Sequence, residues 1–326
     1  MKHFAVTTMA KERSELLEIG EPPALEPDEI RGRTICSLIS PGTELAWSYC
    51  GKSFPTTPGY ASVFKAEEFG SDVKGIEKDS LFFCKGSHRS YQQCRISDAV
   101  EVPDRLEPEK AVIARLVGVS MTTLMTTDAR PGDIVVVTGA GPVGYLAAQI
   151  FAISGYDVII VEPDAGRRAL VGGASGARTF EKTPLDDKSV CGNVALVVEC
   201  SGHEQAVLDA CRIVRKRGEV VLVGVPWRRN TDLYAHEILH EVFHRYVVLR
   251  SGWEWEVPDH SSDFQPHSIH SGFGTAMKWL SDGRVRIDGL STLIDPRRAQ
   301  DAYQDLLHRR AKGLFQIFDW RNLNHA

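Results

Sequence analysis

The feature that most constrains the fold is a glycine-rich turn between an apolar run and a helical segment. The stretch IVVVTGAGPVGYLAAQIFA carries Gly139, Gly141 and Gly144 in a G-x-G-x-x-G arrangement. The first glycine permits a tight turn, the second lets the backbone approach a pyrophosphate, and the third lets helix and strand pack closely. The helix N-terminus adds N–H donors and partial positive charge. The stretch therefore predicts a dinucleotide-binding βαβ unit.

An acidic residue follows this turn where such units hold the adenosine ribose. Glu162 directly follows the next apolar run, DVIIV, about 20 residues after the glycines. A carboxylate there accepts the ribose hydroxyls and repels a 2′-phosphate, which favours NAD over NADP. Arg167 and Arg168 leave NADP as an alternative cofactor, since an arginine near this position can bind a 2′-phosphate. Their alternative interpretation is as solvated helix residues or residues that stack on adenine.

From residue 134 onward, short apolar runs alternate with segments of helical spacing. Strands that are apolar throughout are buried on both faces, as in a parallel sheet. We therefore expect an α/β fold with a doubly wound, six-stranded parallel sheet. The apolar runs are IVVV, DVIIV, VALVVE, EVVLVG and YVVLR, and the helical segments include GYLAAQIFAIS and HEQAVLDACRIVRKR.

The parts before and after this alternation have a different character. The first is rich in Pro, Gly and short β-type runs, such as IRGRTICSLI and YASVFKAEEF, and predicts an irregular β domain. Pro108 to Ala129 is expected to form one long helix. The tail, with AMKWLSDG, AQDAYQDLLHRR and LFQIFDW, is expected to return to the first domain. The expected domains are 1–116, 117–262 and 263–326.

Composition excludes several classes of function. The net charge of −5 argues against nucleic-acid partners, which need clustered positive charge. No window approaches the roughly 20 apolar residues that span a bilayer, and the opening MKHFAVTTMAKERSE has no signal-peptide core. The seven cysteines are odd in number and form no C-x-x-C pair, which is typical of a reduced cytoplasmic protein. No membrane or nucleic-acid partner is expected.

A second motif points elsewhere. His236-Glu237-Ile238-Leu239-His240 matches the zinc-peptidase pattern H-E-x-x-H, and His244 follows one turn later. The extended peptidase pattern requires a glycine and a third histidine where this chain has Phe243 and Tyr246. We interpret the motif as a coincidence on the helix before the last parallel strand, with the three histidines on one face.

Beyond the turn, the chain resembles the medium-chain dehydrogenase/reductase superfamily nearly from end to end. The resemblance is carried by PGYASVFKAEEFGSDVKGIEKDS, DARPGDIVVVTGAGPVG, VVECSGHEQAVLDACRIVRKRGEVVLVGVP and the closing AYQDLLHRRAKGLFQI. It implies a GroES-like β domain, a Rossmann domain and a C-terminal return. It also implies cofactor contacts beyond the glycines and Glu162, at Pro142, Val143, Ser201, Gly202, Val223 and Val225. Val143 packs on the nicotinamide in this reading, and the backbone of Val223 and Val225 binds its carboxamide.

The ligands of the catalytic zinc in this superfamily are missing here. ISPGTEL places Pro41, or Ser40 with a shift of one, where zinc members carry a cysteine. Tyr60 stands at the histidine of the G-H-E motif, and VIARLVGVSM offers no Cys, Asp, Glu or His. CKGSHRSYQQC replaces the four-cysteine lobe. Since catalytic zinc needs three protein ligands, we expect a zinc-independent member with no metal.

Without a Lewis acid, hydride transfer still needs a proton donor or acceptor on the substrate oxygen. Thr43 matches the hydroxyl relay of the superfamily, and Tyr60 offers a phenol whose pKa a nearby cation would have to lower. Glu44 and His88 are the candidate bases. Their alternative roles are a turn residue for Thr43, a filler for Tyr60, an ion pair for Glu44 and a surface histidine for His88.

The leading hypothesis is an NAD-dependent, zinc-independent dehydrogenase acting on a secondary alcohol or its ketone. By resemblance to metal-free relatives of polyol dehydrogenases, a sugar, cyclitol or specialised-metabolite alcohol is the expected small-molecule substrate. The alternatives are an NADPH-dependent quinone or enoyl reductase and a catalytically silent NAD-binding protein. A homodimer is expected, and Trp253 and Trp255 are assigned to the substrate cleft or the subunit contact.

Overall fold

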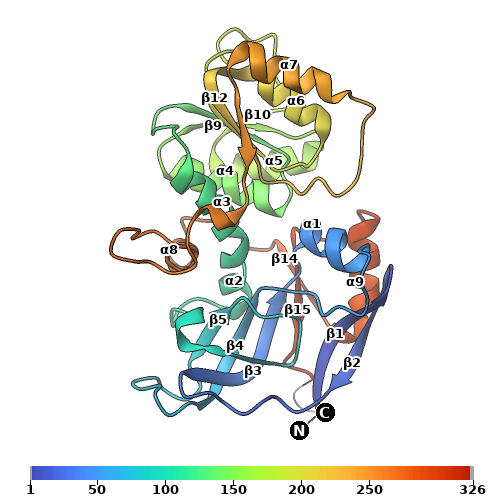
Figure 1. Ribbon diagram of the computed structural model, residues 1–326, viewed down its shortest axis with the longest axis vertical. Coiled ribbons are helices and arrows are strands. Elements are labelled where there is room, and N and C mark those ends of the chain that lie inside the picture. Colours follow the sequence, from blue (N-terminus) through green and yellow to red (C-terminus); the bar gives the residue numbers. More distant parts are fainter. Residues whose placement is uncertain (1, 324–326) are drawn as a thin grey trace. The chain divides into compact units, whose positions relative to one another are not determined.

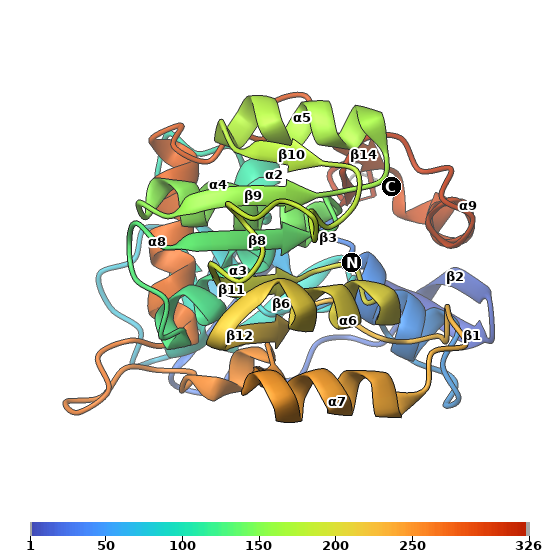
Figure 2. The same ribbon diagram turned by 90° about the horizontal axis from the view of Figure 1, so that it is seen from above.

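The alternation of strands and helices forms one parallel sheet of six strands. In the computed structural model, which describes residues 2–323, the strand order is β10-β9-β8-β11-β12-β13 and every neighbouring pair is parallel. Figure 2 shows β10, β9, β8, β11 and β12 side by side. This is the predicted doubly wound topology. The strands are β8 (Ile134–Thr138), β9 (Asp157–Val161), β10 (Arg178–Phe180), β11 (Val194–Glu199), β12 (Val214–Leu222) and β13 (Val248–Ser251).

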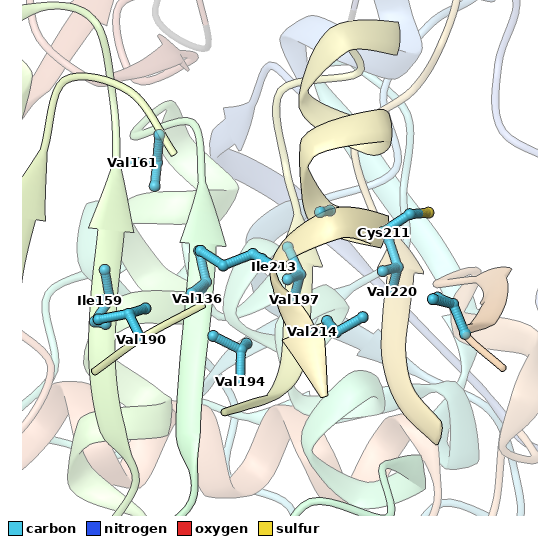
Figure 3. Packing of buried hydrophobic residues seen from close by; sticks show 12 residues of the cluster. Val136, Ile159, Val161, Val190, Val194, Val197, Cys211, Ile213, Val214 and Val220 are labelled. Carbon is cyan, nitrogen blue, oxygen red and sulfur yellow. The ribbon is translucent and has the colours of Figure 1, made fainter. Parts of the chain in front are cut away.

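Helices cover this sheet in two pairs. α4 and α5 contact each other and pack on β8, β9 and β10, whereas α6 and α7 contact each other and pack on β11 and β12. Figure 3 shows the core on the α6 side, where strand valines meet Cys211 and Ile213 of α6. Burial on both faces explains why the strands are apolar throughout. The helices are α4 (Pro142–Ile153), α5 (Ala165–Ser175), α6 (Glu204–Ile213) and α7 (Ala235–Arg245).

Two details of this sheet differ from the prediction. Helix α6 was expected to continue through the basic run, but it ends at Ile213 and β12 begins at Val214. Val214 pairs with Val194 of β11, so strand pairing overrides the local helical spacing. The short edge strand β10 carries no apolar run and had no counterpart among the predicted strands.

The first part of the chain and its tail form a mainly antiparallel β structure (Figure 1). A sheet has the order β14-β15-β3-β4-β5-β7, with β6 paired to β3, and β1 and β2 form a separate hairpin. β15 from the tail pairs with β3 near the start, which confirms the predicted return of the chain. The strands are β1 (His3–Ala10), β2 (Arg13–Ile19), β3 (Glu29–Leu38), β4 (Ser62–Phe69), β5 (Leu81–Cys84), β6 (Tyr91–Arg95), β7 (Ala99–Glu101), β14 (Ser291–Ile294) and β15 (Phe315–Asp319).

The expected single helix from Pro108 to Ala129 is wrong. It is two helices separated by Val112 and Ile113, where bonds of the i to i+3 type tighten the chain. These β-branched residues are fully buried, so packing and a low helix propensity both favour the break. The remaining helices are α1 (Pro41–Thr43), η1 (Glu44–Tyr49), η2 (Ile96–Asp98), α2 (Pro108–Ala111), α3 (Ala114–Thr126), η3 (Glu254–Glu256), α8 (Ile269–Ser281), η4 (Pro296–Arg298) and α9 (Ala299–Leu307).

The contacts divide the chain into two compact units. The first unit comprises Met1–Arg115, Phe273–Gly283 and Ile287–Ala326, and the second comprises Leu116–Gly272 and Arg284–Arg286. The first division lies one residue from the expected boundary after 116, and the next lies ten residues beyond the expected boundary after 262. Among residues 2–323, none of the helices combines the length and apolar character needed to cross a bilayer.

Candidate functional site

In the second unit, the glycine turn has the geometry that its sequence predicts. Gly139 has a φ of +80°, a conformation that residues with a side chain rarely adopt. A Cβ on Gly144 would lie 1.8 Å from the carbonyl oxygen of Gly139. The first glycine is therefore required for the turn, and the third for the close approach of α4 to it.

Gly141 has a different role in the same turn. It is the residue that precedes α4, Pro142 occupies the first helical position, and Val143 is half-buried in the first turn. A Cβ built on Gly141 would meet nothing within 4 Å. The space in front of the helix N-terminus is thus open, and a side chain here would fill it. An open space beside unsatisfied helical N–H groups fits a pyrophosphate.

Glu162 lies directly after β9 and is almost completely buried. One carboxylate oxygen accepts a hydrogen bond from the backbone N–H of Ala140 at 2.7 Å, and the other accepts one from Asp164 at 2.9 Å. Each carboxylate oxygen has about two acceptor positions, so one remains on each for a ribose hydroxyl. Glu162 therefore also fixes the glycine turn to the end of β9.

The two arginines after Glu162 lie in different environments. The guanidinium of Arg168 donates to the backbone carbonyls of Glu162 and Pro163 at 2.7 and 2.6 Å. Arg167 is exposed, and its backbone N–H donates to the capping carboxylate of Asp164. Arg168 thus supports the loop, whereas the Arg167 side chain extends into solvent.

Ser201 and Gly202 lie at the end of β11, where a buried carboxylate organises them. Glu199 accepts from the backbone N–H of Ser201 at 2.8 Å and of Gly202 at 3.0 Å, and also from the Ser201 hydroxyl. Burial raises the pKa of Glu199, and these hydrogen bonds oppose the rise. Glu199 was not among the predicted site residues. Its signal was a carboxylate that closes the buried run VALVVE.

Val223 and Val225 follow β12. The N–H of Val223 donates to the carbonyl of Glu199 at 2.9 Å. The carbonyl of Val225 accepts from the N–H of Trp227 at 2.9 Å. These two bonds use the Val223 N–H and the Val225 carbonyl. They leave the Val223 carbonyl and the Val225 N–H available for the predicted carboxamide contacts.

In the first unit, the hydroxyl groups of Ser40, Thr43 and Tyr60 lie close together. Ser40 precedes α1, Thr43 ends it, and Tyr60 lies in the segment before β4. The phenol of Tyr60 donates to the Ser40 hydroxyl. The pKa of Tyr60 is raised, because burial outweighs the lowering effects of Arg115 and of hydrogen bonds with Ser40 and Thr43. The structure thus brings Thr43 and Tyr60 together.

Glu44 and His88 form a buried polar network behind these hydroxyls. The Glu44 carboxylate accepts from the Ser40 backbone N–H at 2.7 Å and from the Tyr303 phenol at 2.6 Å. His88 Nε2 lies 3.0 Å from the same carboxylate. Glu44 is 2% exposed and His88 is 0% exposed. The carboxylate therefore anchors the loop that carries Ser40.

The far end of this network runs through Ser37 to Trp320. Trp320 Nε1–H donates to the Ser37 hydroxyl at 2.9 Å, and that hydroxyl lies 2.8 Å from His88 Nδ1. The indole N–H fills one acceptor position of the Ser37 hydroxyl, which therefore connects Trp320 to His88 and through it to Glu44. The Ser–His–Glu order is that of a hydrolase triad, but Ser37 is fully buried and offers no exposed nucleophile.

The alternative role of His88 as a surface histidine is wrong. Its ring packs edge-on against Phe318, with centroids 4.9 Å apart. Gly59 has a φ of +97°, and a Cβ on it would lie within 3 Å of the His88 ring. The polar-looking run KGSHRSY gave no sign of this burial. It results from the pairing of distant segments.

Arg115 is the functional candidate that the sequence analysis missed. It lies near the start of α3, within VIARLVGVSM, and is 5% exposed. Its guanidinium carbon lies 4.5 Å from the Tyr60 ring centre and 5.7 Å from that of Phe273. The sequence prediction considered only Cys, Asp, Glu and His in this stretch, so it did not consider the guanidinium of Arg115. The first unit thus has a positive charge beside the phenol.

The H-E-x-x-H stretch forms α7, as predicted. The rings of His236 and His240 lie 6.3 Å apart and those of His240 and His244 lie 4.4 Å apart along the helix. Ile238 and Val242 face the core, and α7 has no fully buried residue. The histidines belong to the outward side of a covering helix. In the same unit Trp253 and Trp255 are exposed.

Comparisons with known proteins agree with this fold. Residues 106–252 match the family described as glucose dehydrogenase C-terminus. An uncharacterised zinc-type alcohol dehydrogenase-like protein of Escherichia coli is 32% identical over 139 residues, which cover 39% of each chain. Sorbitol dehydrogenase of Halalkalibacterium halodurans is 26% identical over 68% of this chain and 62% of its own. These curated relatives are thus matched over less than two thirds of their length.

The whole chain has a counterpart among solved structures. Galactitol-1-phosphate dehydrogenase from Escherichia coli superposes with a TM-score of 0.81 at 17% identity, over 98% of this chain and 100% of that one. At this identity the likeness establishes the fold. The chain therefore has the two-domain α/β fold of alcohol dehydrogenases, and its relatives support the resemblance to the medium-chain dehydrogenase/reductase superfamily.

Proposed function

We propose that this protein is an NAD-dependent, zinc-independent dehydrogenase that interconverts a secondary alcohol and its ketone. The observation that carries the proposal is the glycine turn. It has the required φ at Gly139, close packing at Gly144 and open space in front of Gly141. A sugar, cyclitol or similar polyol is the proposed substrate class, because the matched relatives include enzymes named for sorbitol and galactitol phosphate.

The second unit holds the dinucleotide in this proposal. The backbone N–H groups of Gly141 and Val143, which flank Pro142 at the start of α4, bind the pyrophosphate, and the free acceptor positions of Glu162 bind the adenosine ribose. When bound, the nicotinamide supplies the hydride acceptor for the alcohol or the hydride donor for the ketone. The buried carboxylate of Glu162 disfavours a 2′-phosphate, so NAD is the proposed cofactor.

Zinc independence rests on side chains that this chain has. Ser40, Pro41 and Tyr60 stand at the ligand positions of zinc relatives, and none is a usual zinc ligand. The word zinc in the name of one relative describes that relative.

The first unit supplies the proton chemistry. Oxidation of a secondary alcohol releases a hydride from carbon and a proton from oxygen, and a basic group must take that proton. Tyr60 is the proposed group, with the Ser40 and Thr43 hydroxyls as its hydrogen-bond partners. Glu44 and His88 hold the loop of Ser40 and are proposed to act as supports.

The test is turnover by the purified, chelator-treated protein. Nicotinamide absorbance is followed with polyols and secondary alcohols plus NAD, and with ketones plus NADH or NADPH. We expect zinc-free turnover that prefers NAD, and a loss of about 10²- to 10⁴-fold in kcat/KM for Tyr60→Phe. Thr43→Ala is expected to lose less. Turnover that returns only with zinc, or reduction of a C=C bond by NADPH alone, would overturn the proposal.

Assembly and location extend the same proposal. We propose a homodimer in the cytoplasm. The apolar side chains that α7 and the adjoining residues expose include Leu239, Phe243, Tyr246 and Val248, and β13 is an edge strand of its sheet. Sedimentation at micromolar concentration tests the assembly.

A further inference from the structure

The buried Arg115 and the half-buried Tyr60 form a pair that the expected zinc ligands did not predict. The guanidinium carbon lies 4.5 Å from the centre of the Tyr60 ring, and the ring of Phe273 lies 5.7 Å from the same carbon. Arg115 is 5% exposed. Arginine stays protonated in such surroundings and stacks on aromatic faces. The first unit thus keeps a permanent positive charge against the one phenol that donates to Ser40.

We infer that Arg115 is the positioning residue that governs the protonation of Tyr60 and thereby the pH range in which Tyr60 exchanges a proton with the substrate hydroxyl. The inference rests on the proposed function and deepens it, since it gives this chain a cation where zinc relatives have a metal. Arg115 acts through Tyr60, whose phenol oxygen is the group that gains or loses the proton.

The charges around Tyr60 determine the sign of the effect. Burial raises the pKa of Tyr60, Arg115 is the largest opposing influence, and the hydroxyls of Ser40 and Thr43 add to it. The Glu44 carboxylate raises the pKa, and it is itself held by His88 and Tyr303. Without the guanidinium, burial and Glu44 raise the pKa of Tyr60 with less opposition. Tyr60 is therefore expected to ionise at higher pH.

The proton balance connects this ionisation to turnover. In alcohol oxidation the substrate O–H bond breaks and the phenolate of Tyr60 takes the proton, so the rate rises with pH through the pKa of Tyr60. In ketone reduction the neutral phenol gives its proton to the substrate oxygen, so the rate falls over the same range. In Arg115→Met, the rise of the oxidation rate and the fall of the reduction rate are both expected to move to higher pH by about one pH unit.

Tyrosinate absorbance gives a readout that needs no substrate. The pH titration of the whole protein is compared with that of Tyr60→Phe, and the difference isolates Tyr60. Arg115→Met tests the loss of charge, and Arg115→Lys keeps the charge without the flat stack. Arg89→Met is the matched control, because Arg89 lies 4.9 Å from the ring of Tyr91. Circular dichroism verifies the fold of each variant.

We expect the Tyr60 transition and both activity limbs to move upward together in Arg115→Met, less in Arg115→Lys, and not in Arg89→Met. If Arg115→Met does not fold, the inference is tested by the shift of the Tyr60 transition in Arg115→Lys. A transition at the same pH in wild type and the Arg115 variants would overturn the inference, as would a wild-type titration identical to that of Tyr60→Phe up to unfolding. A shifted transition without nicotinamide turnover supports the coupling and overturns the proposed function.

Discussion

The two units build their candidate sites in opposite ways. In the second unit the site is mostly backbone, with Gly139, Gly141 and Gly144 lying within six consecutive positions. In the first unit it consists of side chains far apart in sequence, such as Glu44, His88 and Tyr303, which meet in a buried network. Added atoms are expected to disturb the backbone site in the second unit. Loss of one hydrogen-bond partner is expected to destabilise the side-chain network in the first unit. The substitutions described next test this difference, from the largest expected effect to the smallest.

The largest effect is expected from Glu44→Ala in the first unit. The change removes a buried carboxylate and leaves His88, Tyr303 and the Ser40 backbone N–H without their acceptor. Loss of one partner from a buried network costs about 3–5 kcal/mol. Denaturant unfolding measures the free energy of unfolding.

Tyr303→Phe is the graded control for this experiment. It removes one donor to Glu44 and keeps the ring that stacks on Tyr49, so we expect a loss of about 1 kcal/mol. Equal losses in both variants, or a loss below about 1 kcal/mol for Glu44→Ala, would contradict the view that the carboxylate holds this network together.

The next effect is expected from Gly144→Ala in the second unit. The new Cβ would lie 1.8 Å from the Gly139 carbonyl oxygen, so α4 must move away from the turn at a cost of about 1–3 kcal/mol. Thermal unfolding measures the stability, and calorimetry with NAD measures binding. Both are expected to fall.

Gly141→Ala is the matched control in the same turn. Its Cβ meets no protein atom within 4 Å, so the melting temperature should stay unchanged. Binding of NAD should still fall, because the methyl group occupies the space proposed for the pyrophosphate. A variant that binds NAD as tightly as wild type would argue against this placement of the phosphates.

The smallest effect is expected from Asp133→Asn, at the turn before β8. The carboxylate accepts from the Arg130 backbone N–H and pairs with Arg215, and these contacts lower the pKa of Asp133. A lowered pKa means that the stabilisation is present above the unfolded pKa of about 3.9 and is lost as pH falls through the folded value.

For this partly exposed pair we expect a difference below about 1 kcal/mol at neutral pH. Urea unfolding of wild type and variant is measured at neutral and at strongly acidic pH. The difference in free energy of unfolding should disappear in acid. A difference that grows as the pH falls would show that the effect does not come from the charge of Asp133.

Local patterns predicted some elements well and others poorly. The parallel strands and the glycine turn were predicted because each signal lies within one short stretch. The break at Val112 and Ile113 and the early end of α6 were not predicted, since burial and strand pairing decided them. His88 had a surface role as its alternative because nothing near it in sequence shows that Phe318 packs against its ring.

The sequence by itself determined the local features of the second unit: where the sheet begins, which glycines make the turn, and which carboxylate follows it. Those features depend on φ angles and side-chain size at neighbouring positions, which a sequence displays directly. Only the tertiary structure decided that Arg115 lies against Tyr60 and that Glu44 receives His88 and Tyr303. Contacts between residues so far apart arise when strands pair and helices pack, and no local pattern encodes them.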